Sequence, residues 1–285
     1  MSNLFNICFA LFQREIPLYG LFVMIGGVAA LLVALLLIKK VNLEFFDFMC
    51  CVGFIIIGAF VGAKLLSILT SLKLIITFFV VVQPPLMEGL FMIMQSGFVF
   101  YGGLIGGLIA LVLYCKVCKV SIRPYISVAA VVLPLGHAFG RVGCFFGGCC
   151  YGIEYDGWLS YTYTHADNTV EGLIGVPRFP VQLLEACCLL ILFGVILYVF
   201  LKKPNSFAST VAYIIGYSFL RFCLEFLRGD KERGGFLNVS TSQWISILLV
   251  VGLTIAVIIY NKKFKNPLKS ETPQINDSGE TNNEQ

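Results

Sequence analysis

Charge is the scarcest feature of this sequence. Only 13% of its 285 residues are charged, whereas a soluble globular domain averages about a quarter. With 58% hydrophobic residues and a mean hydropathy of +0.89, the chain cannot cover a soluble core with polar surface. These proportions exclude an ordinary soluble enzyme and predict an all-α, polytopic membrane protein. The net charge of +4 needs no nucleic-acid partner, because basic loops held near anionic lipid account for it.

Three further absences narrow the choice. The first dozen residues lack the length and the basic start of a cleavable signal peptide, so they are expected to lie on the outer membrane interface. Five of the 11 cysteines lie inside apolar runs, where cysteine behaves as a small hydrophobe: Cys50, Cys51, Cys187, Cys188 and Cys223. Cys115 and Cys118 form a CxxC without a second pair or a nearby histidine, which disfavours zinc there. No motif is duplicated between the two halves of the chain, although transporters often show such repeats.

Apolar segments long enough to cross a bilayer, at about 20 residues each, fill most of the chain. We expect about seven transmembrane helices, near residues 18–38, 45–70, 97–115, 125–146, 180–201, 208–227 and 243–260. Segment 72–86 is too short and ends in two prolines, which indicates an interfacial or re-entrant piece. Residues 1–263 are predicted to form one integral-membrane domain with a small extracytoplasmic head at 147–179. The polar stretch 264–285 is predicted to be a disordered cytoplasmic tail.

Basic residues distribute unequally between the two sides of this arrangement. Eleven of the 20 lysines and arginines fall in turns on one side, six fall on the other side, and three lie within spans. Short loops rich in lysine and arginine stay in the cytoplasm. The sequence therefore predicts an outside N-terminus and a cytoplasmic C-terminus.

Several ionisable groups lie inside the predicted spans, where each costs at least about 2.5 to 3.5 kcal/mol and commonly serves function. On the fourth span, His137, Arg141 and Cys144 are spaced i, i+4 and i+7, which places them on one helical face. Glycines including Gly140 and Gly143 surround them, so a neighbouring helix or a lipid headgroup can approach closely. Arg141 has no acidic neighbour in its own segment.

The sixth span carries a similar stripe. Tyr217, Arg221, Glu225 and Arg228 follow at i, i+4, i+8 and i+11. The two intramembrane arginines are therefore predicted to converge on one anion, and the planar fork of arginine suits a phosphate. A purely structural interpretation stays open as well, in which Arg221 only pairs with Glu225 and Arg141 snorkels to the membrane surface.

Other polar groups are expected to face the interior of the bundle. They are Lys64, Gln182, Glu185 and Gln243. Tyr101 precedes Gly102 and Gly103 at the start of the third span, and its ring is equally typical of the aromatic belt at a membrane interface.

With these residues identified, the chain resembles the prolipoprotein diacylglyceryl transferases, bacterial membrane enzymes that begin lipoprotein maturation, over residues 18–260. Motifs similar to those of the family occur in the same order. They are YG at 19–20, GAFVGAK at 58–64, YGGLIGG at 101–107, FGRVGCFFGGCCYG at 139–152, RFPVQLLEA at 178–186, GYSFLRFCLEFLRGD at 216–230 and TSQWIS at 241–246.

The chain departs from the family pattern at several positions. Tyr101 stands where the family has histidine, and Lys64 stands where it usually has arginine. Cys144 and Gly147 replace two asparagines, and Cys149 replaces a glutamate. The arginines are kept, whereas the replaced residues include those suited to tune or move protons.

The resemblance implies transfer of the diacylglyceryl group from phosphatidylglycerol to the thiol of a lipobox cysteine in a prolipoprotein signal peptide, in the bacterial cytoplasmic membrane. It requires no metal and no bound cofactor. Arg141 and Arg221 would hold the departing phosphate, and Glu225 would orient Arg221. Tyr101 and His137 are the candidate proton acceptors, although we expect the cationic field of the arginines to generate the thiolate without a dedicated base. The implied substrate-binding residues are Tyr19, Lys64, Gly102, Gly103, Gly140, Gly143, Cys144, Gly152, Gln182, Glu185, Tyr217, Arg228 and Gln243.

Two alternatives remain. In a paralogue of the same fold, Cys144, Cys149, Cys150 and His137 would bind metal or exchange thiols at the outer face, although their spacing is not a standard zinc pattern. In a membrane transporter, the intramembrane charges would line a substrate path.

Overall fold

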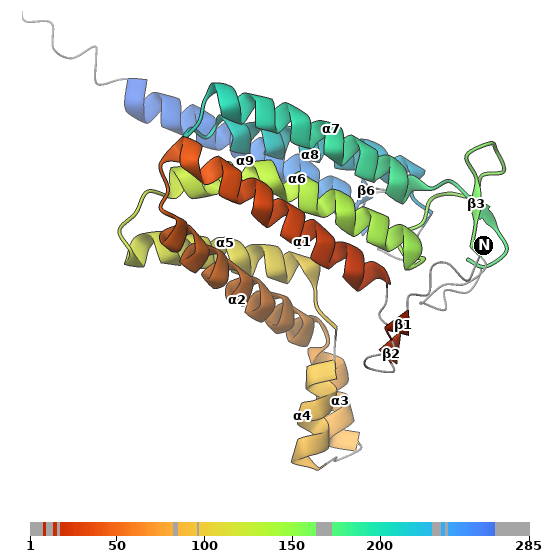
Figure 1. Cartoon of the computed structure of the whole chain (residues 1–285). Helices are drawn as coiled ribbons and strands as arrows, with labels where there is room; N and C mark the ends of the chain where they lie inside the picture. The colour runs from red at the N-terminus through yellow and green to blue at the C-terminus, as the bar shows by residue number, and fades with distance from the viewer. Residues whose placement is uncertain are drawn as a thin grey trace, which may run out of the picture.

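The computed structural model of the chain describes residues 8–9, 14–15, 18–81, 85–95, 97–163, 173–229, 235–236 and 239–265. It is almost entirely helical (Figure 1). Its helices are α1 (Leu18–Leu37), η2 (Ile38–Val41), α2 (Phe45–Thr70), α3 (Leu72–Val81), α4 (Leu86–Gln95), α5 (Phe100–Val117), α6 (Ile122–Phe146), α7 (Val181–Lys202), α8 (Ala208–Leu224), η3 (Glu225–Leu227) and α9 (Thr241–Lys265). Three short antiparallel ribbons complete it, pairing β1 (Cys8–Phe9) with β2 (Arg14–Glu15), β3 (Tyr161–Thr162) with β4 (Pro177–Arg178), and β5 (Gly235–Phe236) with β6 (Val239–Ser240).

The predicted membrane-spanning segments fold as long helices. Within the described residues, six of them are long and apolar enough to cross a membrane, and α9 lies over the seventh predicted span. A helix satisfies every backbone hydrogen bond inside its own segment, which a lipid environment demands. The chain is therefore an all-helical, multi-pass membrane protein. Helix α9 runs to Lys265, two residues beyond the boundary predicted for the tail, and 266–285 lie outside the described residues.

The segment predicted to be too short to span forms two short helices. Helices α3 and α4 have ten residues each, which gives each a length of about 15 Å. They project together away from the long helices (Figure 1), and the ring of Phe79 packs against Gly89. The short helix over 72–81 confirms that this segment does not continue the preceding span.

Glycines bring two pairs of long helices into close contact. A Cβ atom added to Gly58 would lie 2.8 Å from the carbonyl oxygen of Gly106, so α2 and α5 touch backbone to backbone. In the same way, a Cβ on Gly26 of α1 would lie 3.0 Å from the carbonyl oxygen of Gly136 of α6. Lipid tails give no hydrophobic force between helices, so such small residues allow dispersion contact to hold them together. At Gly136 and Gly143 of the fourth span, the neighbour that approaches closely is therefore α1.

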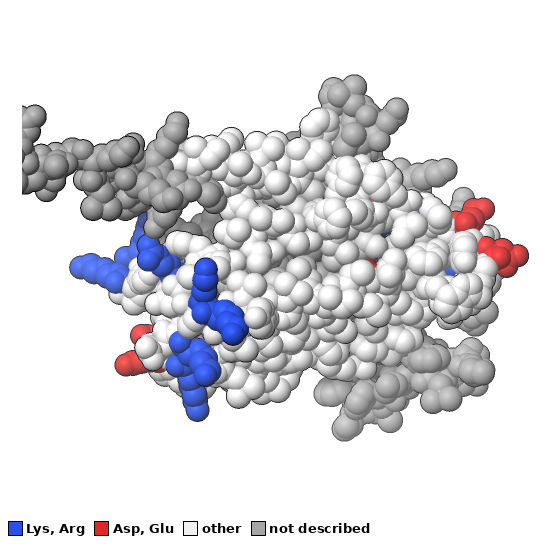
Figure 2. All heavy atoms as spheres, turned by 90° about the horizontal axis from the view of Figure 1, so that it is seen from above, with Lys and Arg blue, Asp and Glu red and all other residues white. Residues whose placement is uncertain are grey.

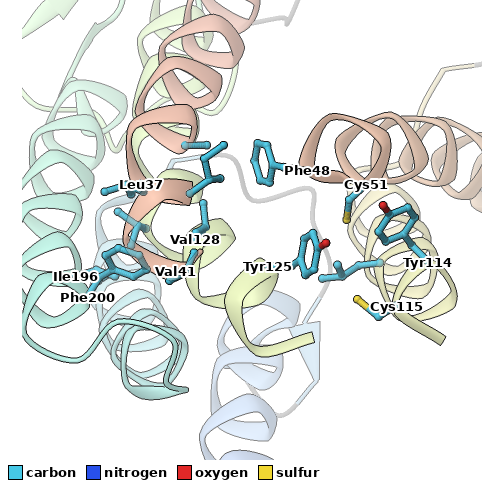
Figure 3. Packing of buried hydrophobic residues seen from close by; sticks show 14 residues of the cluster. Leu37, Val41, Phe48, Cys51, Tyr114, Cys115, Tyr125, Val128, Ile196 and Phe200 are labelled. Atoms are coloured by element: carbon cyan, nitrogen blue, oxygen red, sulfur yellow. The ribbon is translucent and has the colours of Figure 1, made fainter. Parts of the chain in front are cut away.

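The largest cluster of buried apolar side chains lies away from the intramembrane arginines, at the end of the bundle where α1 and α7 finish (Figure 3). Phe200 and Ile196 of α7 are fully buried there, and Val128 of α6 packs with them. Cys51 and Cys115 are buried in the same cluster, as expected for cysteine acting as a small hydrophobe. The two cysteines of the CxxC therefore differ in exposure, because Cys115 is buried and Cys118 is exposed.

The surface separates into an apolar body and charged ends. Lysines and arginines gather at one end of the long axis, where α1, α5 and α7 finish (Figure 2). Large apolar side chains are exposed along the helices between the ends, for example Leu36, Ile57 and Phe219. An exposed apolar band of this kind is stable in lipid but not in water.

Candidate active site

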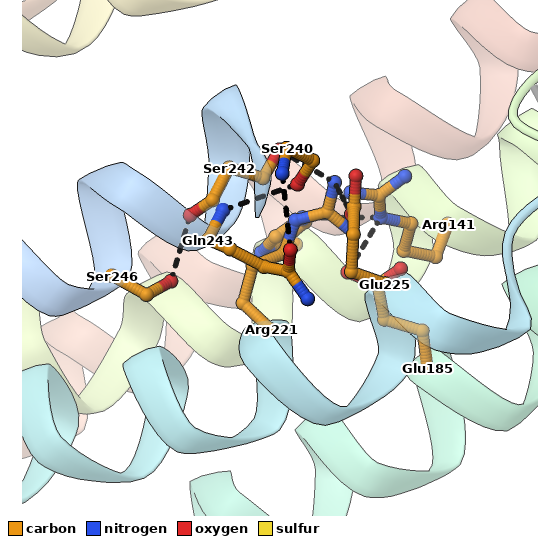
Figure 4. Close-up of polar contacts among 9 residues, drawn as sticks. Arg141, Glu185, Arg221, Glu225, Ser240, Ser242, Gln243 and Ser246 are labelled. Atoms are coloured by element: carbon orange, nitrogen blue, oxygen red, sulfur yellow. Dashed lines mark hydrogen bonds and ion pairs between the residues drawn. The ribbon is translucent and has the colours of Figure 1, made fainter. Parts of the chain in front are cut away.

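A polar cluster lies at the end of the bundle opposite the basic turns. Helices α6 and α8 end there, and α7 and α9 begin there (Figure 1). Each of the four contributes polar side chains, which meet in one place (Figure 4). The cluster includes two arginines and two carboxylates, all nearly buried.

Arg141 of α6 is held by two neighbours. Its Nε lies 3.0 Å from Oε1 of Glu185 on α7 and donates a hydrogen bond of 3.3 Å to Nε2 of His137. Only 2% of the Glu185 side chain and 12% of the Arg141 side chain are exposed. Within the described part of the chain both contacts use Nε, so the two terminal nitrogens of the guanidinium are available to another acceptor. The segment of Arg141 contains no neighbouring acid, and the carboxylate that pairs with it comes from α7.

Two neighbours hold the guanidinium of Arg221 on α8: one lies in the turn η3 that follows this helix, and the other lies on α9. Its Nη2 lies 2.8 Å from Oε2 of Glu225, the predicted i, i+4 pair, and donates a hydrogen bond of 3.0 Å to Oγ of Ser242. Its Nη1 is buried and has no hydrogen-bond partner among the described residues. A buried guanidinium N–H without an acceptor is costly, so this nitrogen marks a position where an anion would be stabilised.

Aromatic rings connect the two arginines. The His137 ring lies 5.3 Å from the Tyr217 ring, and Tyr217 stacks on Tyr213 with 5.8 Å between centroids. The Tyr217 hydroxyl interacts electrostatically with Glu185, both arginines and Tyr101. Arg141 and Arg221 therefore both lie near Tyr217, and their convergence on one anion stays a prediction.

Three cysteines adjoin the cluster because of the way α6 ends. Gly148, at φ +65°, follows the last turn, and its N–H donates to the carbonyl of Phe145 while that of Cys149 donates to the carbonyl of Cys144. This is a Schellman motif, which brings the residue two positions past the cap beside the last helical turn. Cys150 turns back at φ +57°, and the sulfurs of Cys144, Cys149 and Cys150 lie within 4.8 Å of one another.

The pKa values of the two thiols that follow the helix, Cys149 and Cys150, are shifted in opposite directions. Hydrogen bonds from Cys144 and Cys149, with the charges of Arg228 and Arg141, hold the pKa of Cys150 below its usual range. Hydrogen bonds to Cys144 and Cys150 raise the pKa of Cys149. The charges of Arg228 and Arg141 therefore favour the ionised form of Cys150.

Hydrogen bonds connect the predicted extracytoplasmic head to this end of the bundle, next to the cysteines. Nε2 of Gln182 on α7 donates to the carbonyl of Cys149 at 2.8 Å and to the hydroxyl of Tyr163 at 3.1 Å. Burial raises the pKa of Tyr163 to about 12, so the phenol stays protonated. Gly152 pairs with Arg228 as an isolated antiparallel bridge, and its carbonyl accepts a hydrogen bond of 3.3 Å from Arg178. Loop residues 164–172 lie outside the described residues.

Comparison with known families agrees with this arrangement. The family model described as prolipoprotein diacylglyceryl transferase matches residues 6–260, which is nearly the whole chain. The chain belongs to the prolipoprotein diacylglyceryl transferase family.

Individual relatives cover most of the chain. A protein of Clostridium tetani is 32% identical over 257 residues, which is 90% of this chain and 96% of the relative. A protein of Helicobacter pylori strain Shi470 is 30% identical, over 92% of this chain and 94% of the relative. A second clostridial protein, from Clostridium perfringens, is 33% identical over 72% of this chain and 75% of its own length. All three carry the name phosphatidylglycerol–prolipoprotein diacylglyceryl transferase.

In this transferase, most of the predicted site residues lie in or beside the polar cluster, but the sixth-span stripe needs correction. Helix α8 ends at Leu224, Glu225 begins the 3-10 turn η3, and Arg228 is extended. Arg228 therefore reaches Cys150 and the head from a loop, and it does not continue a helical face below Arg221.

Several residues predicted to bind substrate make contacts within the protein. Gln243 accepts the N–H of Ser240 at 3.0 Å and returns its own N–H to the Ser240 hydroxyl at 3.2 Å, which is a capping box that starts α9. Gly102 and Gly103 pack against α2. Lys64 donates to the carbonyl of Met94 at 3.1 Å.

Other predicted residues lie at the open side of the cluster. Tyr19 lies in the first turn of α1 with 47% of its surface exposed, and its backbone packs on Gly143. Tyr101 is 39% exposed. A Cβ atom added to Gly140 would meet nothing within 4 Å, so there is free space on α6 beside Arg141.

Sequence reasoning missed the serines of α9. Ser242 accepts a hydrogen bond from Arg221, and Ser246 donates to the Ser242 carbonyl at 2.9 Å one turn later. Both are buried. Their i, i+4 spacing at the start of an apolar helix was a usable signal, because buried hydroxyls inside a span require partners.

Proposed function

We propose that Arg141 and Arg221 together bind the phosphodiester of phosphatidylglycerol while its diacylglyceryl group passes to the thiol of a lipobox cysteine. The observation that carries this proposal is the buried Nη1 of Arg221, which has no acceptor within the described structure and lies in the same cluster as Arg141. A phosphate oxygen would supply the missing acceptor. Arginine forks bind two oxygens of one phosphate, which lysine cannot do.

The carboxylates make such a site tolerable inside a membrane. Glu185 and Glu225 each neutralise one arginine, so the protein does not hold two uncompensated cations in lipid. Their contacts also fix the orientation of both guanidinium groups before the lipid arrives. Preorganised donors of this kind are more effective in a water-poor site than in water, because they need no reorganisation during the reaction.

The reaction then requires a thiolate and a stabilised leaving group. The thiolate sulfur bonds to the glyceryl carbon, the bond between that carbon and the phosphate oxygen breaks, and glycerol phosphate leaves with the electron pair. The two arginines stabilise the charge that grows on the phosphate. If each acts as an oxyanion donor does, its removal costs on the order of 3 kcal/mol of transition-state stabilisation.

His137 is poorly placed to be the general base. Its Nε2 accepts a hydrogen bond from Arg141, so that lone pair is already engaged. We therefore assign His137 to positioning Arg141, and the proton of the acceptor thiol to another group.

Lipid is proposed to enter beside α6. Free space at Gly140 and the exposed rings of Tyr19 and Tyr101 adjoin the arginine cluster. A headgroup entering from the bilayer would pass these residues before it reaches Arg141. The basic end of the bundle is proposed to face the cytoplasm, with the active site toward the outer face of the bacterial membrane, because basic loops are retained on the cytoplasmic side.

The test is a mass assay on the purified protein in phosphatidylglycerol liposomes with a synthetic lipobox peptide. A gain of one diacylglyceryl unit on the cysteine, absent when phosphatidylglycerol is replaced by phosphatidylcholine, is the expected result. The Clostridium tetani relative serves as the positive control. A silent reaction with a working control would refute the proposal.

A further inference from the structure

The mechanism above leaves the Cys144–Cys149–Cys150 cluster without a role. The Schellman motif and the left-handed Cys150 bring the three sulfurs within 4.8 Å of one another beside the arginines. Vicinal cysteines also occur at Cys187 and Cys188, but those lie on α7, where the side chain of Cys187 faces outward. Only the first group gathers three ligands within the described residues.

The spacing of the three sulfurs fits a metal with soft ligands. A zinc–sulfur bond is about 2.3 Å long, which separates sulfurs around one ion by about 3.8 to 4.0 Å. Closing the cluster from at most 4.8 Å needs only side-chain adjustment of less than about 1 Å per pair. Thiolates select zinc and related thiophilic cations over magnesium or calcium.

Among the described residues, the cluster offers three sulfur ligands, and the neighbouring carboxylates and histidine already have other partners. Glu185 and Glu225 are engaged by Arg141 and Arg221, and His137 accepts from Arg141. A divalent ion with three thiolates carries one negative charge, which the nearby Arg141 and Arg228 would balance. Three protein ligands with an open position is the pattern of catalytic zinc, whereas structural zinc has four.

We propose that Cys144, Cys149 and Cys150 bind a thiophilic divalent cation of the zinc class, and that its open position takes the acceptor thiol of the lipobox cysteine. This inference rests on the proposed function, and it supplies the thiolate for which His137 is poorly placed as a base. A coordinated thiol is deprotonated, and its proton passes to solvent.

The chemistry balances without an oxidant or reductant. The coordinated sulfur keeps a nucleophilic lone pair and attacks the glyceryl carbon, whose bond to the phosphate oxygen breaks. Glycerol phosphate leaves with that electron pair, held by the arginines. The product is a neutral thioether, a weaker ligand than thiolate, and it leaves the ion. Free space at Gly140, one turn before Cys144 on the same helical face, gives the two substrates room to meet.

The first experiment measures metal binding without turnover. The transferase in nanodiscs is reduced, stripped with chelator and loaded anaerobically with Zn²⁺, and zinc X-ray absorption is recorded. The expected result is one tightly bound ion with three sulfurs at about 2.3 Å. Addition of the lipobox peptide should raise the sulfur number to four, and the same peptide with serine in place of cysteine should leave it at three.

Matched variants locate the site. Cys144→Ser, Cys149→Ser and Cys150→Ser should each lose the bound equivalent, whereas Cys118→Ser and Cys187→Ser, which alter exposed cysteines elsewhere, should keep it. Loss of zinc in Cys118→Ser alone would move the site to the CxxC and overturn the proposal. Failure of the wild-type protein to bind zinc would also overturn the proposal. So would a number of zinc-bound sulfurs that stays the same when the lipobox peptide is added.

Activity separates this inference from the function on which it rests. Metal-stripped protein should lose at least tenfold in transfer rate and regain it with Zn²⁺. Full activity in the stripped protein would refute the catalytic metal and leave the transferase function intact. If the protein binds zinc and the zinc coordinates the peptide thiol, but no diacylglyceryl group is transferred under any condition, the metal site is retained and the proposed function is refuted.

Discussion

Replacement of Arg141 by alanine removes two things at once, and the structure allows them to be separated. The variant loses a phosphate ligand, and it leaves the Glu185 carboxylate, whose side chain is only 2% exposed, without its partner 3.0 Å away. Breaking a buried pair from one side costs about 3 to 5 kcal/mol of stability. Loss of an oxyanion donor costs about 3 to 4 kcal/mol in the transition state, or about 100- to 1,000-fold in rate.

A second substitution removes the stability effect alone. In the double variant Arg141→Ala with Glu185→Gln, no uncompensated charge remains, so the thermal unfolding midpoint should return most of the way to that of the wild type. If Arg141 binds phosphate, the transfer rate should stay about 100-fold or more below the wild type, because the glutamine supplies no cation. The unfolding midpoint and the transfer rate are therefore expected to respond differently to the added Glu185→Gln substitution.

The assay compares transfer to the lipobox peptide with thermal unfolding, both in phosphatidylglycerol nanodiscs. Arg123→Ala serves as the control, because Arg123 lies on the same helix at the basic end and packs its charge over Phe207. It should lose less than threefold in rate. Recovery of the double variant to within tenfold of the wild-type rate would refute phosphate binding by Arg141 and assign that residue a structural role.

Three further predictions follow from single contacts. His137→Ala should keep more than a tenth of the transfer rate, because Glu185 still holds Arg141; a loss as large as that of Arg141→Ala would show that His137 takes part in the chemistry. Gly106→Leu should destabilise the protein by about 3 kcal/mol or more, since even a Cβ there would lie 2.9 Å from the Gly62 backbone; an unchanged unfolding midpoint would contradict the α2–α5 contact. Gln182→Leu should cost about 1 to 3 kcal/mol in unfolding experiments, because the carbonyl of Cys149 loses its donor, and wild-type stability would argue against that hydrogen bond.

The residues at the end of α6 show which contacts the spacing of residues along the sequence predicts and which it does not. Spacing alone predicted that His137 and Arg141 share a face, and they are hydrogen-bonded. The predicted span ends at 146, as α6 does, but the contact between three sulfurs depends on the backbone turning back at Cys150. That turn is stabilised by partners on α7 and in the head, which no local pattern identifies.

The sequence by itself determined that this protein is a multi-pass helical membrane protein, because apolar length and scarcity of charge allow no other fold, and its motifs pointed to the transferase family. It also singled out both intramembrane arginines, since each is costly in lipid without a function. Only the tertiary structure decided that Glu185 pairs with Arg141, that Ser242 anchors Arg221, and that Arg228 leaves the helical stripe. These contacts join residues from different helices, and their distances depend on how the helices pack, which side-chain spacing within one segment does not encode.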